Sequence, residues 1–500
     1  MRKVLVSFVS LIALVGLVSL TSCKKEEAGN GTQFHATMEG CTNQHGKTVL
    51  DGTALNWVSG DQIVVYGTDG SGIYTATPQS PATTAIFDNV SGETGSAPFR
   101  AFYPSTLTTD GVNITLPAMQ VTVDGSLTNF PMYAESDGNE LAFKNLCGVL
   151  KLHLTKANTS ISSIEVVANS EVNGTFSVNL SGGVPELTYV SGGTNSVTLT
   201  STTAQDISEG ADFYVCLPAT FDSVKSITLV TNGGLICTKK VKITSQINVS
   251  RSQYTLVTLD ENDLEFRPIG SKGGLFTVNA DGDQVWFSQG NLQYQASTGT
   301  WRFAENQYDY IGSANSSTYN GWIDLFGWGT GNNPTLASTD NADYSTFVDW
   351  GVNAISNGGN VANSGWRTLS HLEWACILFN RANASAKRGN GSVGGVYGEI
   401  LLPDSWILPS GLTFTPGYNN WQNNYTLAQW VEMEDAGAIF LPASGYGSIF
   451  ELTGFYWSSS FVSDWEGMAF CHEFSEDGFG DSSSWEKLWG MSVRLVYDNN

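Results

Sequence analysis

The sequence predicts a multidomain protein in which an all-β region is followed by an α+β domain. Residues 33–260 contain short runs in which apolar and polar residues alternate, such as 61–66 (DQIVVY) and 148–155 (GVLKLHLT), with Gly, Asn, Ser and Asp between them. No stretch of this region has the apolar period of a helix. The tryptophan content changes sharply near residue 265: 14 of the 15 tryptophans lie after it. The one clear helical pattern also comes later, within residues 364–385, and the chain is long enough for two or three domains.

The first 23 residues form a predicted export signal. Arg2 and Lys3 precede an apolar run over residues 4–20, which is shorter than the ~20 residues of a membrane span. Residues 20–23 (LTSC) resemble the end of a bacterial lipoprotein signal, which implies that Cys23 receives the lipids. Residues 24–27 (KKEE) resemble the tether that directs lipoproteins of the Bacteroidetes to the cell surface, and they also suit a solvated linker. We therefore expect a signal peptide over 1–23, a tether over 24–32 and a lipid-anchored, surface-exposed protein of the outer membrane.

Composition narrows the classes of partner. A net charge of -24 argues against nucleic acid, because binding a polyanion needs a basic face. Only 14% of the residues are charged, and 54 glycines with 12% aromatics indicate extracellular β-structure instead of disorder. Six cysteines remain besides Cys23, an even number that permits disulfides. Two of them lie in apolar runs that suit buried free thiols equally well, so the pairing stays open; the six are Cys41, Cys147, Cys216, Cys237, Cys376 and Cys471.

Three short motifs in the β-rich region occur in a characteristic order. They are 57–63 (WVSGDQI), 102–104 (FYP) and 141–148 (LAFKNLCG), and together they resemble the fimbrillin (Mfa-like) family of the Bacteroidetes. The resemblance implies two tandem transthyretin-like sandwiches, which we place at 33–155 and 156–262, used as pilus subunits or surface stalks. A polar stretch with Pro268 and several glycines then predicts a linker over 263–271.

One departure from that family bears on assembly. Polymerising fimbrillins are cut after a basic residue near the N-terminus, often arginine. Here no arginine occurs between Arg2 and Arg100, and only a lysine such as Lys47 could serve. The chain also ends four residues after Val496, which leaves no spare strand to donate. We therefore expect the protein to sit at a fimbrial tip or to act alone on the membrane.

Residues 272–500 resemble a different family. The strings TLSHLEW, LLPDSWILPSGL, GFYWSSS and SVRLV resemble the C-type-lectin-like domain of Bacteroidetes surface proteins. That domain is related in fold to formylglycine-generating enzymes and to the variable proteins of diversity-generating retroelements. The resemblance implies an α+β C-type-lectin-like domain over 272–500 that binds a ligand.

Two helices are predicted in this domain. Ser370 is an expected N-cap with Glu373 three residues on, and the expected buried face consists of Leu372, Ala375, Cys376 and Phe379. A second, shorter helix is expected over residues 426–436, with Leu427, Trp430 and Met433 on one side.

Residues 454–496 contain ten aromatic side chains, four of them tryptophan, interleaved with seven acidic residues and one histidine. The rings occur in both phases of the strand alternation, which we interpret as a recognition surface plus core, with core alone as the alternative. By the retroelement resemblance, residues 456–459 and 492–494 are a fixed frame, and the residues between them are exposed ligand contacts. These contacts are Phe461, Val462, Asp464, Trp465, Met468, Phe470, Glu473, Phe479, Asp481, Trp485 and Lys487. We expect burial for Trp457 and Trp489, and we expect His472 to be a core histidine; whether the segment is diversified stays open.

Catalytic and metal-binding patterns are absent from the sequence. No G-x-S-x-G, C-x-x-C or HE-x-x-H occurs, and the five histidines are scattered without a triad signature. The match to G-x-G-x-x-G at 389–394 is expected in a loop. The acidic stretch 475–481 lacks EF-hand spacing, so we expect an ordinary acidic turn there. We therefore predict no catalytic residues, no metal and no cofactor.

The function predicted from these observations is that of a cell-surface lipoprotein adhesin, with a fimbrial tip as one setting. It would bind a host, dietary or bacterial surface protein or glycan through its C-terminal domain, with the membrane as partner through the lipid and fimbrial subunits as further partners. Two alternatives are a structural fimbrial accessory or anchor subunit, and a glycan-utilisation or hydrolytic surface protein.

Overall fold

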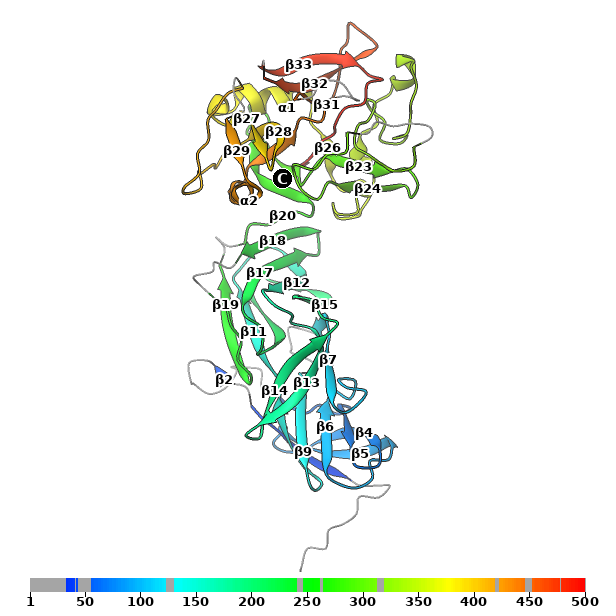
Figure 1. Ribbon diagram of the computed structural model, residues 1–500, viewed down its shortest axis with the longest axis vertical. Helices are drawn as coiled ribbons and strands as arrows, with labels where there is room; N and C mark the ends of the chain where they lie inside the picture. Colours follow the sequence, from blue (N-terminus) through cyan, green and yellow to red (C-terminus); the bar gives the residue numbers. More distant parts are fainter. Residues whose placement is uncertain are drawn as a thin grey trace, which may run out of the picture.

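The computed structural model describes residues 33–40, 42–43, 55–122, 130–240, 246–260, 264–312, 319–418, 422–445, 452–476 and 478–499. The predicted signal, Cys23 and the tether, together with Cys41 and Lys47, lie outside these residues. The molecule is elongated: two β-rich units form a stalk, and residues from 271 onward form a head at its far end (Figure 1). No helix within the described ranges is long and apolar enough to cross a membrane.

The first unit is a closed seven-stranded barrel in the order β1-β10-β9-β6-β3-β4-β5. Parallel pairing of β1 with β10 and antiparallel pairing of β1 with β5 close the sheet, so this unit has no open edge. The prediction that this region is all-β is confirmed. A sandwich of two separate sheets was expected for residues 33–155, whereas the structure has one sheet that closes on itself. The strands are β1 (Phe34–Met38), β3 (Gln62–Tyr66), β4 (Ser71–Pro78), β5 (Thr84–Gly92), β6 (Phe99–Tyr103), β9 (Met132–Ser136) and β10 (Glu140–Asn145).

The motif at 57–63 acts as a structural corner of this barrel. Trp57 is buried, and its ring meets those of Phe87, Tyr103 and Phe143 edge-on, with centroids 4.9–5.4 Å apart. Asp61 accepts a hydrogen bond from the Val58 amide at 2.8 Å and another from the Tyr103 hydroxyl at 3.0 Å. The aromatic residue and the carboxylate are therefore needed together, because one fills the core and the other fixes the turn beside it.

The second unit packs a four-stranded sheet, β16-β11-β19-β2, and a six-stranded sheet, β20-β18-β17-β12-β15-β8, around a core of aliphatic residues. A further sheet, β14-β13-β7, joins it to the barrel. The strands are β2 (Thr42–Asn43), β7 (Asn113–Leu116), β8 (Met119–Thr122), β11 (Cys147–Leu154), β12 (Ser160–Ala168), β13 (Gly174–Ser181), β14 (Val184–Ser191), β15 (Ser196–Asp206), β16 (Ala211–Pro218), β17 (Val224–Thr231), β18 (Leu235–Lys240), β19 (Gln253–Leu259) and β20 (Arg267–Pro268).

The predicted boundary between residues 155 and 156 does not separate these sheets. Strand β11, assigned to the first unit, pairs with β16 and β19 of the second. Strands β7 and β8 also lie before the boundary and pair with β13 and β15. These pairings join residues about 60–110 positions apart, and local composition carries no information about such partners. All five cysteines in the described ranges are buried, and none of them is joined in a disulfide.

The junction between stalk and head is a strand where a linker was predicted. Residues of β20 pair with β18, and the Ile269 amide donates to the carbonyl of Gly234. On the head side, the Gln289 amide donates to the carbonyl of Gly270. Backbone hydrogen bonds to both neighbours therefore hold residues 267–271 in place.

The head contains four small sheets: β21-β22-β34-β26, β24-β23-β25, β29-β27-β28-β30 and β31-β32-β33. Their strands are β21 (Ser271–Thr277), β22 (Gln284–Ser288), β23 (Leu292–Gln295), β24 (Thr300–Phe303), β25 (Trp322–Ile323), β26 (Trp366–Thr368), β27 (Arg388–Val393), β28 (Val396–Leu401), β29 (Asn423–Tyr425), β30 (Ile439–Pro442), β31 (Gly454–Phe461), β32 (Met468–Ser475), β33 (Gly478–Glu486) and β34 (Leu495–Asp498). The helical segments are η1 (Asn341–Tyr344), η2 (Trp350–Val352), α1 (His371–Ala375), η3 (Cys376–Asn380), η4 (Ala384–Ala386) and α2 (Leu427–Asp435). The G-x-G-x-x-G match at 389–394 lies mainly in β27 and not in a loop.

Both predicted helices form, and α1 begins with the capping box expected from Ser370 and Glu373. Helix α2 also begins with a capping box, formed by Thr426 and Gln429, which the sequence analysis did not predict. The predicted faces are partly wrong. Leu372 is 68% exposed and Phe379 is also exposed, whereas Trp374, Ile377 and Leu378 are buried. For Phe379 the reason is that α1 continues as the π-helical η3, whose wider turn changes the residue spacing on which the face was predicted. In α2, Trp430 and Met433 are buried as expected but Leu427 is exposed.

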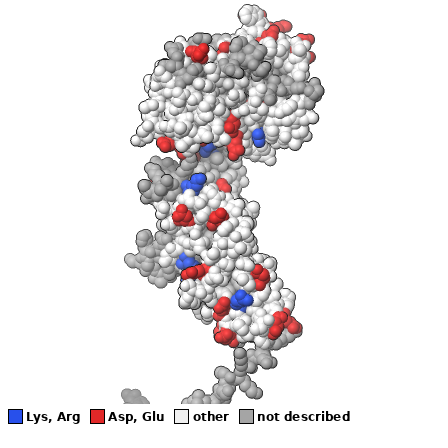
Figure 2. Space-filling view, viewed as in Figure 1, with Lys and Arg blue, Asp and Glu red and all other residues white. Residues whose placement is uncertain are grey.

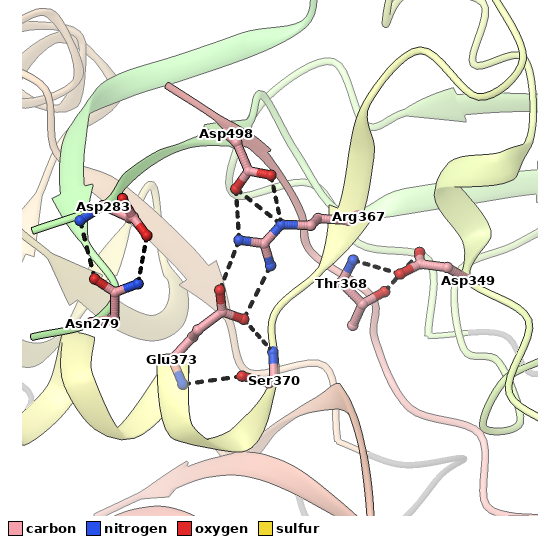
Figure 3. Close-up of polar contacts among 8 residues, drawn as sticks. All are labelled: Asn279, Asp283, Asp349, Arg367, Thr368, Ser370, Glu373 and Asp498. Carbon is pink, nitrogen blue, oxygen red and sulfur yellow. Dashed lines mark hydrogen bonds and ion pairs between the residues drawn. The ribbon is translucent and has the colours of Figure 1, made fainter. Parts of the chain in front are cut away.

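An arginine ties the start of α1 to the last strand. Arg367 of β26 donates hydrogen bonds to both carboxylate oxygens of Glu373 at 2.7 and 3.0 Å, and to both of Asp498 in β34 (Figure 3). Burial by itself would lower the pKa of Arg367, but the hydrogen bonds to Asp498 and Glu373 outweigh it and raise that pKa. Glu373 also accepts from the Ser370 amide at 2.7 Å, so one carboxylate closes the capping box and holds the arginine.

We expect Glu373→Ala to lower the free energy of unfolding of the head by about 1–2 kcal/mol, because the cap and a partly exposed ion pair are lost together. Glu373→Gln keeps an acceptor for the Ser370 amide, so it should cost about half as much. Denaturant unfolding followed by tryptophan fluorescence reports the head, which holds 14 of the 15 tryptophans. Equal losses in the two variants would contradict the role given to the cap.

Candidate ligand-binding site

The aromatic-rich segment forms the sheet β31-β32-β33, at the end of the head farthest from the stalk (Figure 1). Both faces of this sheet are covered. Phe455 and Trp457 pack into one core cluster with Phe326 and Trp350. Tyr456 lies in the other phase and packs into a second cluster around α1, together with Phe474. The sequence analysis interpreted rings in both phases as a recognition surface plus core, and these residues belong to the core. A sheet that is buried on both faces needs apolar residues in both phases.

Irregular pairing of the strands is a second reason why buried residues occur in both phases of the alternation. The register shifts between Trp457 and Phe461 in β31, and between Cys471 and Glu473 in β32. A bulge inserts one residue and reverses the alternation beyond it. As a result Cys471 and His472, which are neighbours in sequence, are both completely buried.

The residues assigned to a fixed frame are nearly all buried and bound to one another. The Tyr456 hydroxyl donates to the carbonyl of Pro442 at 2.8 Å, and the Ser444 and Ser492 hydroxyls are 2.7 Å apart. Arg494 donates to the side-chain oxygen of Gln307 at 2.8 Å. These contacts join β30 and β31 to the residues just before β34. The frame therefore supports the loop between β31 and β32.

The exposed part of the segment is the loop between β31 and β32. Phe461 is 57% exposed and Trp465 is 64% exposed, and Asp464 between them is exposed too. The loop is closed by backbone hydrogen bonds between Val462 and Met468 and between Trp465 and Met468. Six of the predicted contacts are half-buried: Val462, Met468, Phe470, Glu473, Phe479 and Trp485. The side chain of Asp481 lies outside the described residues.

Lys487 was predicted as an exposed contact and is 4% exposed. Its Nζ lies 4.6 Å from the centre of the Trp328 ring and 5.5 Å from that of Phe461. Burial lowers the pKa of Lys487, and the carboxylate of Glu466 opposes the shift in part. Within the described part of the chain no carboxylate lies within ion-pair distance of this amine, so the two rings and the more distant Glu466 carboxylate stabilise its charge.

Lys487 and the loop line a surface pocket of about 530 Å³. The far wall comes from η1, where Asn341 accepts a hydrogen bond from the Leu488 amide at 3.2 Å. We call this pocket together with the adjacent Trp465 the tip site; its lining residues are Asn341, Ala342, Ser345, Phe461, Val462, Ser463, Glu466, Gly467 and Lys487. The sequence analysis did not name Ser463, Glu466 and Gly467 in the predicted segment, and it missed Asn341, Ala342 and Ser345 outside it. Asp340, the N-cap of η1, was the one local signal that a helical turn begins there.

Phe479 and Phe470 do not line the pocket of the tip site. Phe479 packs edge-on against Tyr418 with centroids 5.6 Å apart, and the guanidinium of Arg388 lies 4.6 Å from its ring. Phe470 stacks on His371 of α1 at 4.3 Å. The structure therefore gathers Phe461, Val462 and Lys487 at the tip site and leaves Phe470 and Phe479 outside it.

His472 is a buried core histidine, as predicted. Its Nε2 lies 2.5 Å from the carboxylate of Glu399, and its ring stacks on Trp374 at 4.8 Å. Both His472 and Glu399 are completely buried. Among the described residues, no group of three or more His, Cys, Asp and Glu side chains is placed to hold a metal ion.

Comparison with known proteins finds no matching family model and no match among curated proteins. Solved structures resemble parts of the chain. A proposed cell adhesion protein from Bacteroides ovatus is 14% identical over 47% of this chain and 94% of its own, with a TM-score of 0.30. A fimbrial protein from the same species is 10% identical over 93% of this chain and 99% of its own, with a TM-score of 0.25. The tip fimbrial protein Mfa3 from Porphyromonas gingivalis is 10% identical over 47% of this chain and 97% of its own, with a TM-score of 0.21.

The structural neighbours are thus fimbrial and cell adhesion proteins of the Bacteroidetes and related bacteria. At these identities and TM-scores the likeness says nothing about what this chain binds. The resemblance of residues 272–500 to C-type-lectin-like domains stays a prediction.

Proposed function

We propose that this chain is an adhesin, in which a β-rich stalk carries a head that captures a protein or glycan ligand at the tip site. The observation that carries the proposal is the pair of exposed rings, Phe461 and Trp465, on a loop beside a pocket floored by a buried lysine. Large rigid rings supply contact area at low entropic cost, and they dominate many binding interfaces.

The position of the tip site supports the same proposal. The sheet that carries the loop lies at the opposite end of the molecule from the N-terminal barrel (Figure 1). The visible face of the head is mostly uncharged, with acidic residues near its upper edge and near its border with the stalk (Figure 2). A lipid at Cys23 would fix the near end to the membrane and present the tip site outward, whether the chain acts alone or within a fimbria. The lining offers contact area and hydrogen-bonding groups, so we propose binding without catalysis.

The test is the double variant Phe461→Ala/Trp465→Ala. If each ring contributes about 2 kcal/mol, the dissociation constant should rise about a thousandfold. Trp485 is not suitable for this test, because it packs edge-on against Phe455 in the core and its loss would destabilise the sheet. The readout is capture of the purified chain on an array of surface proteins and glycans, with and without chelator.

A matched control is Val361→Ala/Ile407→Ala, two exposed apolar residues elsewhere on the head. This variant should bind like the wild type. If the tip variant captures every ligand that the wild type captures, with unchanged affinity, the proposal is refuted. A loss of fimbrial assembly with ligand capture intact would instead favour a structural accessory subunit, and turnover of an arrayed glycan would favour a hydrolase.

A further inference from the structure

The head carries a second pocket, of about 690 Å³, away from the tip site. It lies beside the β23–β24 hairpin, the segment 305–311 that follows it, and the start of β28. We call it the side pocket; its lining includes Gln293, Arg302, Glu305, Tyr308, Asp309 and Tyr310. A volume of this size is typical of small-molecule sites.

One of the groups that line the side pocket is a fixed guanidinium. Arg302 donates from Nε to the side-chain oxygen of Gln293 at 2.8 Å, and its guanidinium carbon lies 3.7 Å from the centre of the Trp322 ring. Gln293 is 3% exposed. Within the described part of the chain, neither the Nη atoms of Arg302 nor the amide nitrogen of Gln293 has a hydrogen-bond partner. A buried amide and a stacked guanidinium are thus held with free donors at the pocket.

Acceptors lie on the other wall. Asp309 uses one carboxylate oxygen to accept from Asn306, and its second oxygen has no partner among the described residues. Glu305 is exposed. The pKa of Tyr308 is raised by burial of that tyrosine and by the negative charges of Asp309, Glu434 and Glu305. Tyr310 is 45% exposed and presents a ring and a hydroxyl. The side pocket therefore offers unpaired donors, unpaired acceptors and an aromatic face together.

This combination selects a class of ligand. The two carboxylates would repel an anion, and Arg302 offsets part of their attraction for a cation. Sugar hydroxyls both donate and accept, and the C–H face of a sugar ring packs on an aromatic ring. We propose that the side pocket binds a neutral sugar unit, with Arg302 and Gln293 as donors, Glu305 and Asp309 as acceptors and Tyr310 as the stacking ring. This is a separate site, and it does not depend on the ligand of the tip site.

The test applies the full chain to an array with four kinds of probe: neutral oligosaccharides of glucose, galactose, mannose and fucose; sialylated and uronic-acid glycans; amine-bearing glycans; and acidic and basic peptides. We expect retention on neutral oligosaccharides. Tyr310→Ala and Arg302→Lys should each weaken it about tenfold or more, since each removes a stacking or hydrogen-bonding contact. Tyr310→Phe keeps the ring and should weaken it less than Tyr310→Ala does.

The matched control is Tyr319→Ala, which removes an equally exposed tyrosine that does not line the pocket. It should bind as the wild type does, and so should Phe461→Ala/Trp465→Ala, which separates this proposal from that of the tip site. Three outcomes would overturn the proposal: no neutral oligosaccharide is retained, retention survives in Tyr310→Ala and Arg302→Lys, or the retained probes are charged glycans or peptides. Glu305→Gln, at an exposed position, provides a variant with little risk to folding.

Discussion

Replacing Asp404 by alanine is expected to lower the free energy of unfolding of the head by about 3–5 kcal/mol. Asp404 pairs with the buried Arg381 at 2.9 Å, and its other oxygen accepts from the amide and hydroxyl of Thr277, each at 2.7 Å. The same oxygen accepts from Gln284 at 3.0 Å. Alanine would leave the guanidinium buried with two carbonyl partners and no counter-charge. It would also remove the acceptor that the Thr277 hydroxyl and the Gln284 side-chain amide share.

The control for this prediction is Asp404→Asn, which keeps one acceptor oxygen and removes the charge. It should lower the free energy of unfolding by less than alanine does.

The pH dependence of this contribution to stability has a definite sign. Burial alone would raise the pKa of Asp404. Hydrogen bonds from Thr277, Gln284 and Arg381 outweigh burial and leave this pKa below the ordinary value of 3.8. The stability it contributes is therefore complete above about pH 4 and is lost as pH falls through the lowered pKa.

Tryptophan fluorescence during urea unfolding, repeated between pH 3 and pH 7, measures both effects. The difference between wild type and Asp404→Asn should be constant above about pH 4 and should shrink below it. A difference that grows on acidification would show that Asp404 is not the stabilising charge.

Trp328→Ala is expected to cost about 3–5 kcal/mol of stability and to abolish capture at the tip site as well. Trp328 is almost fully buried, and its indole N–H donates to the carbonyl of Ser458 at 2.9 Å. Its ring lies under Lys487 and edge-on to Phe461, with the two ring centroids 6.5 Å apart. Removing it leaves a cavity beneath the pocket and takes away the ring over which the buried ammonium is held.

The matched control is Trp350→Ala in the same core cluster. Trp350 is completely buried and packs on Phe326 and Phe347. We expect a similar loss of stability with a smaller loss of binding, measured at a temperature where both variants remain folded. Equal binding losses in the two variants would mean that general destabilisation, and not the floor of the tip site, explains the effect. Trp328→Phe should lie between wild type and alanine in both measurements.

Local sequence signals were sufficient for several elements of the fold. Alternation predicted an all-β region, the N-cap at Ser370 gave the start of α1, and apolar spacing gave the position of α2. Each of these depends on neighbours within a few residues, which is why a single sequence can show them. The pairing of β7, β8 and β11 with strands far along the chain had no such signal, and the predicted boundary between the stalk units failed for that reason.

The candidate site shows the same division at the level of single side chains. The sequence placed an aromatic-rich, loop-containing segment at 454–496 and named Phe461 and Trp465, which the structure exposes. It could not tell that Lys487 is buried on Trp328, or that Asn341 forms the opposite wall, because these contacts join residues about 120–160 positions apart. Alternation along a strand shows which residues share a face, whereas the elements packed on each face decide whether that face is buried. Those elements come from distant parts of the chain, so the fold as a whole selects which rings of this segment meet water.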